Sequence, residues 1–189
     1  MVKIEDVFEE YRQRLLDNNV GILELEIFET FAGTDFIDNT LDLVELLKSR
    51  NYKEILKGLK QIKEAILHIT TNKYTGNQRL GYCNIVEGYI HRVESEIHKE
   101  KKKKDKLLKQ AEEILEQKEL DVVSAEEWIK NFKKYVIENY KVRSRDYKLL
   151  MACILEIKEI ETTTHVSLEV NKILLKTSIS IASELLKYY

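Results

Sequence analysis

Proline does not occur in the 189-residue sequence, and glycine occurs only six times. Sheet proteins need these residues at short intervals to turn their strands, whereas helices tolerate long stretches without them. Apolar residues also recur at spacings of three and four, which is the period of an amphipathic helix. The sequence therefore predicts an all-α protein, a bundle of about six to eight helices that forms a single domain over residues 1–189.

One segment is compatible with a different helical architecture. Residues 40–56 resemble one helical hairpin of a tetratricopeptide-type repeat, with a tight turn at 49–51 and Tyr52 opening the second helix. An ordinary antiparallel helix pair fits the same pattern. A short superhelix of α-hairpins is therefore the alternative to the bundle.

Cysteines and long apolar runs are also scarce. The two cysteines, Cys83 and Cys153, lie in apolar helical segments, which suits buried reduced thiols better than a disulfide framework. The longest uncharged apolar run, 149–155, is far shorter than a membrane span, and charges occur throughout the first twenty residues. We therefore expect a cytoplasmic protein that neither spans nor enters a membrane.

Charged residues are abundant but unevenly distributed. They make up 34% of the chain against 43% hydrophobic residues, and a chain of this composition is expected to fold. The excess of Lys and Glu is typical of thermophiles or of organisms with AT-rich genomes. Residues 1–50 hold twelve acidic and five basic residues, net −7, whereas residues 99–148 hold fifteen basic and eleven acidic residues, net +4. Solvated faces of mixed sign explain this, or else the basic half binds an acidic partner: nucleic acid, or the acidic part of a second copy.

A long central helix is expected over residues 77–117. No proline interrupts this segment, and Gly81 and Gly88 only weaken a helix there. At 1.5 Å per residue it would extend about 60 Å. A helix of this length must protrude, be clasped by its neighbours, or break near its lysine run.

Two polar signatures predict where other helices begin. Thr34 and Asp35 offer an N-cap for a helix over 36–48. Ser124 and Glu127 have the spacing of a capping box, so the next helix is expected to begin at Ser124.

A strip of acids and histidines lies on the expected long helix. At 100° per residue, four side chains fall within about 60° of one another: Glu87, His91, Glu94 and His98. The core-facing stripe of the same helix is separate and consists of Val86, Ile90, Val93 and Ile97. The strip is a candidate metal site or acid/base pair, but the chain lacks both the Glu-x-x-His of ferritin-like sites and paired histidines four residues apart. We therefore expect polar contacts at a helix edge, with no metal and no cofactor.

Arg92 and His98 suggest an alternative function. Their Arg-x5-His spacing is similar to the Arg-x4-6-His motif of HEPN domains, small all-helical proteins of which many are metal-independent ribonucleases of defence and toxin systems. The resemblance implies that Arg92 stabilises a phosphate and His98 transfers a proton during attack of the ribose 2′-OH. On a regular helix the two side chains lie about 120° apart, with Arg92 nearly opposite the core stripe. They would cooperate only on an irregular helix or across a second subunit.

A lysine run follows within residues 99–109. Six of its lysines could neutralise phosphates: Lys101, Lys102, Lys103, Lys104, Lys106 and Lys109. The run contains no aromatic side chain that could stack on bases, so the segment 99–148 could support only non-specific nucleic-acid binding. Solvated lysines on a long helix explain the run without any partner.

Common catalytic signatures are missing from the sequence, including Gly-x-Gly-x-x-Gly, the P-loop, Gly-x-Ser-x-Gly and Cys-x-x-Cys. The long helix and the opposite charges of the two halves instead favour a non-enzymatic interaction or assembly protein that binds a protein partner or itself as a homo-oligomer. The HEPN-like ribonuclease is the alternative, and non-specific nucleic-acid binding through 99–148 is a further one.

Overall fold

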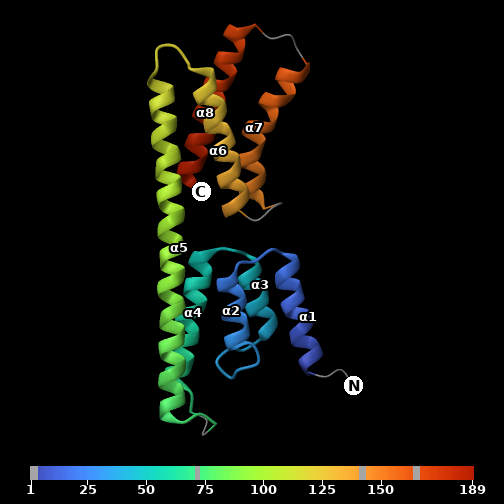
Figure 1. Ribbon diagram of the computed structural model, residues 1–189, viewed down its shortest axis with the longest axis vertical. Helices are drawn as coiled ribbons and strands as arrows, with labels where there is room; N and C mark the ends of the chain where they lie inside the picture. Colours follow the sequence, from blue (N-terminus) through green and yellow to red (C-terminus); the bar gives the residue numbers. More distant parts are fainter. Residues whose placement is uncertain (1–3, 71–72, 141–143, 164–166) are drawn as a thin grey trace. The chain divides into compact units, whose positions relative to one another are not determined.

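A computed structural model of the chain describes residues 4–70, 73–140, 144–163 and 167–189, and over these ranges it contains eight α-helices and no strand (Figure 1). The prediction of an all-α protein with one long central helix is confirmed, and its helices fit a bundle. The helices are α1 (Ile4–Asp17), α2 (Ile22–Phe31), α3 (Thr40–Lys48), α4 (Tyr52–His68), α5 (Gly76–Glu116), α6 (Val122–Asn139), α7 (Arg145–Thr163) and α8 (Leu168–Tyr188).

The chain divides into two compact units, Met1–His98 and Lys99–Tyr189. The N-terminal unit holds α1 to α4 and the first part of α5, and the C-terminal unit holds the rest of α5 with α6, α7 and α8. Each unit has its own hydrophobic core. Because α5 belongs to both units, a single cooperative domain over 1–189 stays a prediction that an unfolding experiment can test.

The core of the N-terminal unit receives side chains from all five of its helical segments. Its fully buried residues include Leu15, Ile27, Phe31, Leu47, Ile55, Leu59, Ile66 and Val93. The stripe predicted on α5 supplies Val86, Ile90 and Val93 as buried residues, while Ile97 is partly buried. The 3.6-residue period therefore identified the buried face of α5 correctly.

The core of the C-terminal unit is built around the chain's one tryptophan, Trp128 of α6. Trp128 is 2% exposed, and its ring stacks on Phe132 with 5.1 Å between centroids. Its Nε1–H donates to the carbonyl oxygen of Leu107 on α5 at 2.8 Å, so the polar atom of the indole is satisfied inside the core. Trp128 is therefore a core residue of this unit.

The central helix α5 is continuous from Gly76 to Glu116, close to the predicted limits of 77 and 117. Gly81 and Gly88 sit within it with open space where a side chain would be. The lysine run does not interrupt the helix, since every residue from 99 to 109 is helical. A break near the lysines, one of the three expected outcomes, does not occur.

Two predicted helix starts are wrong. Helix α3 begins at Thr40, where Asn39 accepts a hydrogen bond from the backbone N–H of Leu41 at 3.0 Å, and residues 32–39 form turns. The Thr34 side chain instead donates to the carbonyl oxygen of Phe31 at the end of α2. The segment stays non-helical because Phe36 is drawn into the core at 3% exposure and packs against two tyrosine rings.

Helix α6 begins at Val122, two residues before the predicted capping box. Asp121 is the N-cap, because its carboxylate accepts from the backbone N–H of Val123 at 3.2 Å. Ser124 donates its hydroxyl to the same carboxylate at 2.6 Å, and this contact is the main reason that the pKa of Asp121 is lowered.

Both cysteines are partly buried, so the expected full burial is not found, and their reduced state stays a prediction. Across the residues that the structure describes, no helix combines the length and the apolar character that a bilayer crossing requires.

Candidate functional site

In the predicted acid and histidine strip on α5, three of the four side chains contact neighbouring side chains: Glu87, His91 and Glu94. Glu87 receives a hydrogen bond at 2.5 Å from the Lys63 ammonium on α4. This contact is the main cause of a lowered Glu87 pKa and of a raised Lys63 pKa. His91 Nδ1 lies 3.6 Å from a Glu94 carboxylate oxygen one turn along the same helix, and His98 is exposed.

Of these contacts, only the one between Glu87 and Lys63 joins two helices. The described residues contain no group of three or more His, Cys, Asp or Glu side chains placed to hold one ion. Glu87 pairs across to α4, while His91 and Glu94 contact each other. The strip thus matches the expected polar helix edge.

Arg92 has a partner that the helical wheel did not reveal. Its guanidinium forms an ion pair with Glu26 of α2 and lies 5.8 Å from the centre of the Tyr89 ring. The Tyr89 hydroxyl in turn donates to the carbonyl oxygen of Glu26 at 3.2 Å and lies 2.8 Å from the Thr30 hydroxyl. Arg92 therefore belongs to the contact between α2 and α5, although its position in the sequence lies nearly opposite the core stripe of α5.

Within one chain, Arg92 and His98 do not converge. The segment between them is regular α-helix, so the side chains stay about 120° apart and about 9 Å apart along the axis. The irregular helix that would have brought them together is not present in α5. A HEPN-like pair assembled across two subunits stays a prediction.

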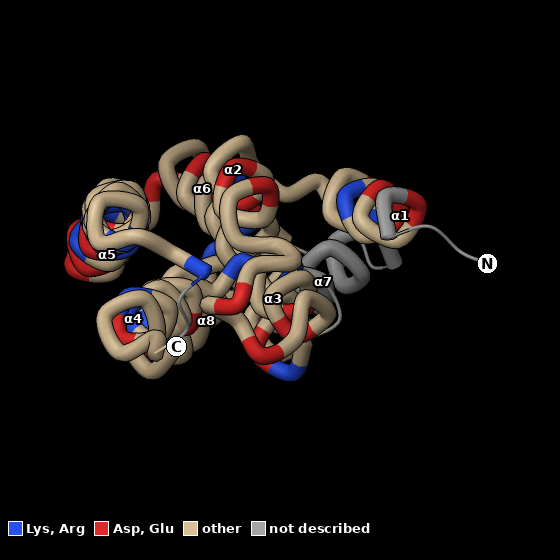
Figure 2. The backbone as a smooth tube through the Cα atoms, turned by 90° about the horizontal axis from the view of Figure 1, so that it is seen from below, with Lys and Arg blue, Asp and Glu red and all other residues tan. Residues whose placement is uncertain are grey.

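The basic segment is partly neutralised within its own unit. Lys103 pairs with Glu138 of α6 at 3.2 Å, and Lys109 lies 3.9 Å from Glu113. Lys101, Lys102 and Lys106 are exposed. Acidic and basic residues are interspersed in the sequence of α5, and both colours are visible where Figure 2 looks down this helix. Residues 141–143 of the segment lie outside the described residues, and its binding of nucleic acid stays a prediction.

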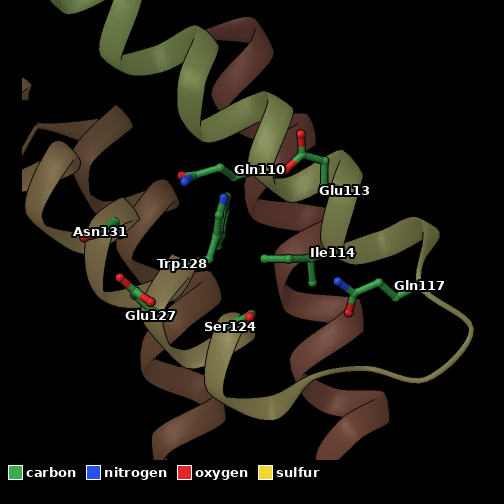
Figure 3. A pocket seen from close by; sticks show the side chains of 8 residues that line it. All are labelled: Gln110, Glu113, Ile114, Gln117, Ser124, Glu127, Trp128 and Asn131. Carbon is green, nitrogen blue, oxygen red and sulfur yellow. The ribbon is translucent and has the colours of Figure 1, made fainter.

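A small hollow lies between α5 and α6 in the C-terminal unit (Figure 3). Its volume is about 210 Å³, and Gln110 and Ile114 point from α5 toward Trp128 at its base. Its lining is Gln110, Glu113, Ile114, Gln117, Ser124, Glu127, Trp128 and Asn131. The amides and carboxylates could hydrogen-bond a small polar ligand, but the Ser124 hydroxyl is already donated to Asp121 and is not a prepared nucleophile.

The strongest feature that sequence reasoning missed is a second apolar face on α8. Its inner face is buried in the core through Leu175, Ile179, Ala182 and Leu186. About 160° around the helix lies a line of exposed apolar side chains, which we name the outer stripe: Val170 at 46% exposure, Ile173 at 64%, Ile181 at 49% and Tyr188 at 83%. The period of α8 could have revealed both faces, but two apolar faces on one helix are easily mistaken for a wide core face.

Comparison with known proteins gives no further identification: no family model, no curated protein and no solved structure matches the chain.

Proposed function

We propose that the chain is a non-enzymatic helical interaction or assembly protein that acts through its surfaces and self-associates. The outer stripe of α8 carries this proposal. Single exposed apolar residues are normal on a protein surface, but exposed apolar residues in line on one helix indicate a surface that a partner covers. Ile173 and Tyr188, at 64% and 83% exposure, have most of their surface available for such a partner.

Three of the polar groups considered for chemistry support the same proposal, because they are committed to structural contacts. The Glu87 carboxylate holds Lys63, and the Arg92 guanidinium holds Glu26. The Ser124 hydroxyl helps to cap α6 through Asp121. A catalytic group must instead be held ready for a substrate, in hydrogen-bond reach of the reacting atom.

Sedimentation velocity over a wide range of protein concentration tests the proposal. We expect the weight-average mass to rise with concentration, and the rise to persist at high salt because burial of apolar surface is not screened by ions. A mass that stays at the monomer value at the highest concentration, in both low and high salt, would contradict self-association.

A further inference from the structure

We propose that the outer stripe of α8 is a dimerisation surface on which α8 of a second copy of this chain packs antiparallel. The inference rests on the proposed function, since it names the surface and the partner through which the chain self-associates. It begins from α8 itself, a helix of 21 residues and thus about 31 Å long. Its inner face is buried and its outer stripe is not.

The positions of the stripe residues suit pairing with an identical helix in the opposite direction. A two-fold axis near Thr177 and Ser178 brings Ile173 of one copy beside Ile181 of the other, within about one helical turn. The same axis brings Val170 beside Tyr188 of the second copy, so the least bulky exposed residue meets the most bulky one. Both contacts occur twice, because a two-fold interface is self-complementary.

The charges of α8 select a second copy and an antiparallel direction. Glu169 lies in the first turn and Lys187 in the last turn, on the same flank of the outer stripe. The axis that pairs the apolar residues also sets Glu169 of one copy opposite Lys187 of the other. In a parallel two-fold pair this flank of the two copies would lie on opposite sides of the interface, so Glu169 and Lys187 would gain no partner of opposite charge.

Two further charges fit the same pairing: Lys176 lies on this flank, and Glu184 lies within the arc of the outer stripe, between Ile173 and Ile181. Lys176 lies about 6 Å along the axis from Glu184 of the second copy, within reach of its long side chain. Within one chain, Glu184 accepts from Lys187 at 2.7 Å, so Lys187 is already held beside the stripe. One helix pair covers a small area, at the lower end of specific interfaces, so we expect a weak dimer that forms at high protein concentration.

Charge exchange tests the direction of pairing. Glu169→Lys and Lys187→Glu each set like charges opposite one another in the homodimer, and each should raise the dimer dissociation constant about tenfold at low salt. An equimolar mixture of the two variants, and the double variant Glu169→Lys/Lys187→Glu, restore opposite charges in the antiparallel pair and should recover most of the affinity. In the double variant, the reversed charges at both ends of α8 are unfavourable to the helix dipole. Recovery of the dimer affinity therefore cannot come from a more stable helix.

Loss of apolar surface tests the location. Ile173→Ser or Ile181→Ser should raise the dissociation constant at least about a hundredfold, because each change removes a contact twice in the dimer. Ile137→Ser on α6, at a site of 45% exposure close to the 49% of Ile181, is the matched control and should keep the wild-type constant. Far-UV circular dichroism of each variant checks that the monomer is folded.

The possible outcomes separate this inference from the proposed function. A wild-type dimer that survives both isoleucine substitutions overturns the α8 surface and leaves self-association standing. Loss of the dimer in the isoleucine variants, without recovery in the charge-exchanged mixture, overturns the antiparallel pairing. A wild-type chain that is monomeric at every concentration overturns both self-association and the α8 dimer, and the outer stripe would then bind a different partner.

Discussion

At the scale of single residues, Gly33 and Gly88 are in opposite structural situations. Gly33 lies in the turn between α2 and α3 with φ at +72°, and a Cβ there would overlap the ring of Phe8. Gly33→Ala should therefore lower the free energy of unfolding by about 2 kcal/mol or more, through backbone strain and displacement of the Phe8 ring. The urea midpoint measures this change.

Gly88→Ala is the matched control for the same substitution. Gly88 is inside α5, and a Cβ there meets no atom within 4 Å. Alanine should raise the free energy of unfolding by about 0.5–1 kcal/mol, because glycine loses more backbone entropy in a helix. Equal effects of the two substitutions would contradict this account of both positions.

Two tyrosines of α6 and its C-cap should make stability fall at alkaline pH. Burial raises the pKa of Tyr140 to about 12, and burial also raises the pKa of Tyr135, with smaller effects of nearby Tyr140, Glu100 and Asp105. The fold favours the protonated phenol, so the stabilisation is complete below the unfolded pKa near 10 and is lost as pH rises toward the folded values.

The free energy of unfolding should thus fall above pH 10 by up to about 1.4 kcal/mol per pH unit for each of the two tyrosines. Urea titrations at pH 9, 10 and 11 measure this slope. The double variant Tyr135→Phe/Tyr140→Phe has no phenol to titrate at these sites, so its slope should be smaller. An unchanged slope in that variant would show that other groups cause the loss.

At the scale of helices, the existence and period of each helix could be predicted, whereas two of the beginnings could not. Ser124 and Glu127 satisfy the capping-box pattern, yet Asp121 caps α6. Several polar residues near a helix start can serve as the cap, and the choice depends on where the first buried residue must lie. Ala125 and Trp128 are buried, and a start at Val122 places both on the inner face of α6.

Phe36 shows why the start of α3 could not be predicted. Its apolar side chain suggested the first turn of a helix. In the structure, Phe36 instead lies in a non-helical segment, and its side chain is buried in the core. Phe36 packs against Tyr74, which lies 38 positions later in the sequence, at 4.7 Å between ring centres. A contact so distant along the chain leaves no periodic signal near residue 36, and the same holds for the pair formed by Arg92 and Glu26.

The hydrogen bond from Trp128 to Leu107 should contribute to the packing of α6 on α5. Replacement of Trp128 by benzothienylalanine keeps the ring shape and removes only the N–H, so we expect the free energy of unfolding to fall by about 1 kcal/mol. Trp128→Phe also removes buried ring volume and should cost more, about 2–4 kcal/mol. Circular dichroism in urea measures both variants. No loss with benzothienylalanine would mean that the hydrogen bond adds no net stability.

At the scale of the whole molecule, the sequence reveals the central helix but not the use of its side chains. Residues 76–116 form one helix because no residue there prevents it. The charge difference between residues 1–50 and 99–148 suggested an acidic surface meeting a basic one. In the structure, however, Lys103 is paired within its own unit, and the surface that carries our proposal is apolar. Net charge over a segment does not show which charges are already neutralised.

The continuous α5 predicts that the two compact units unfold together. Trp128 lies in the C-terminal unit, so its fluorescence reports the unfolding of that unit alone, whereas circular dichroism reports the unfolding of both units.

Leu59→Ala removes a side chain of 1% exposure from the N-terminal core and should lower the free energy of unfolding by about 2–5 kcal/mol. Loss of that core also removes the packing that holds the first part of α5, and helix formation is cooperative along the chain. The Trp128 transition should therefore shift to lower urea by the same amount as the circular dichroism transition. A Trp128 transition that stays at the wild-type midpoint, while part of the helical signal is lost earlier, would show that residues 1–189 form two independent domains.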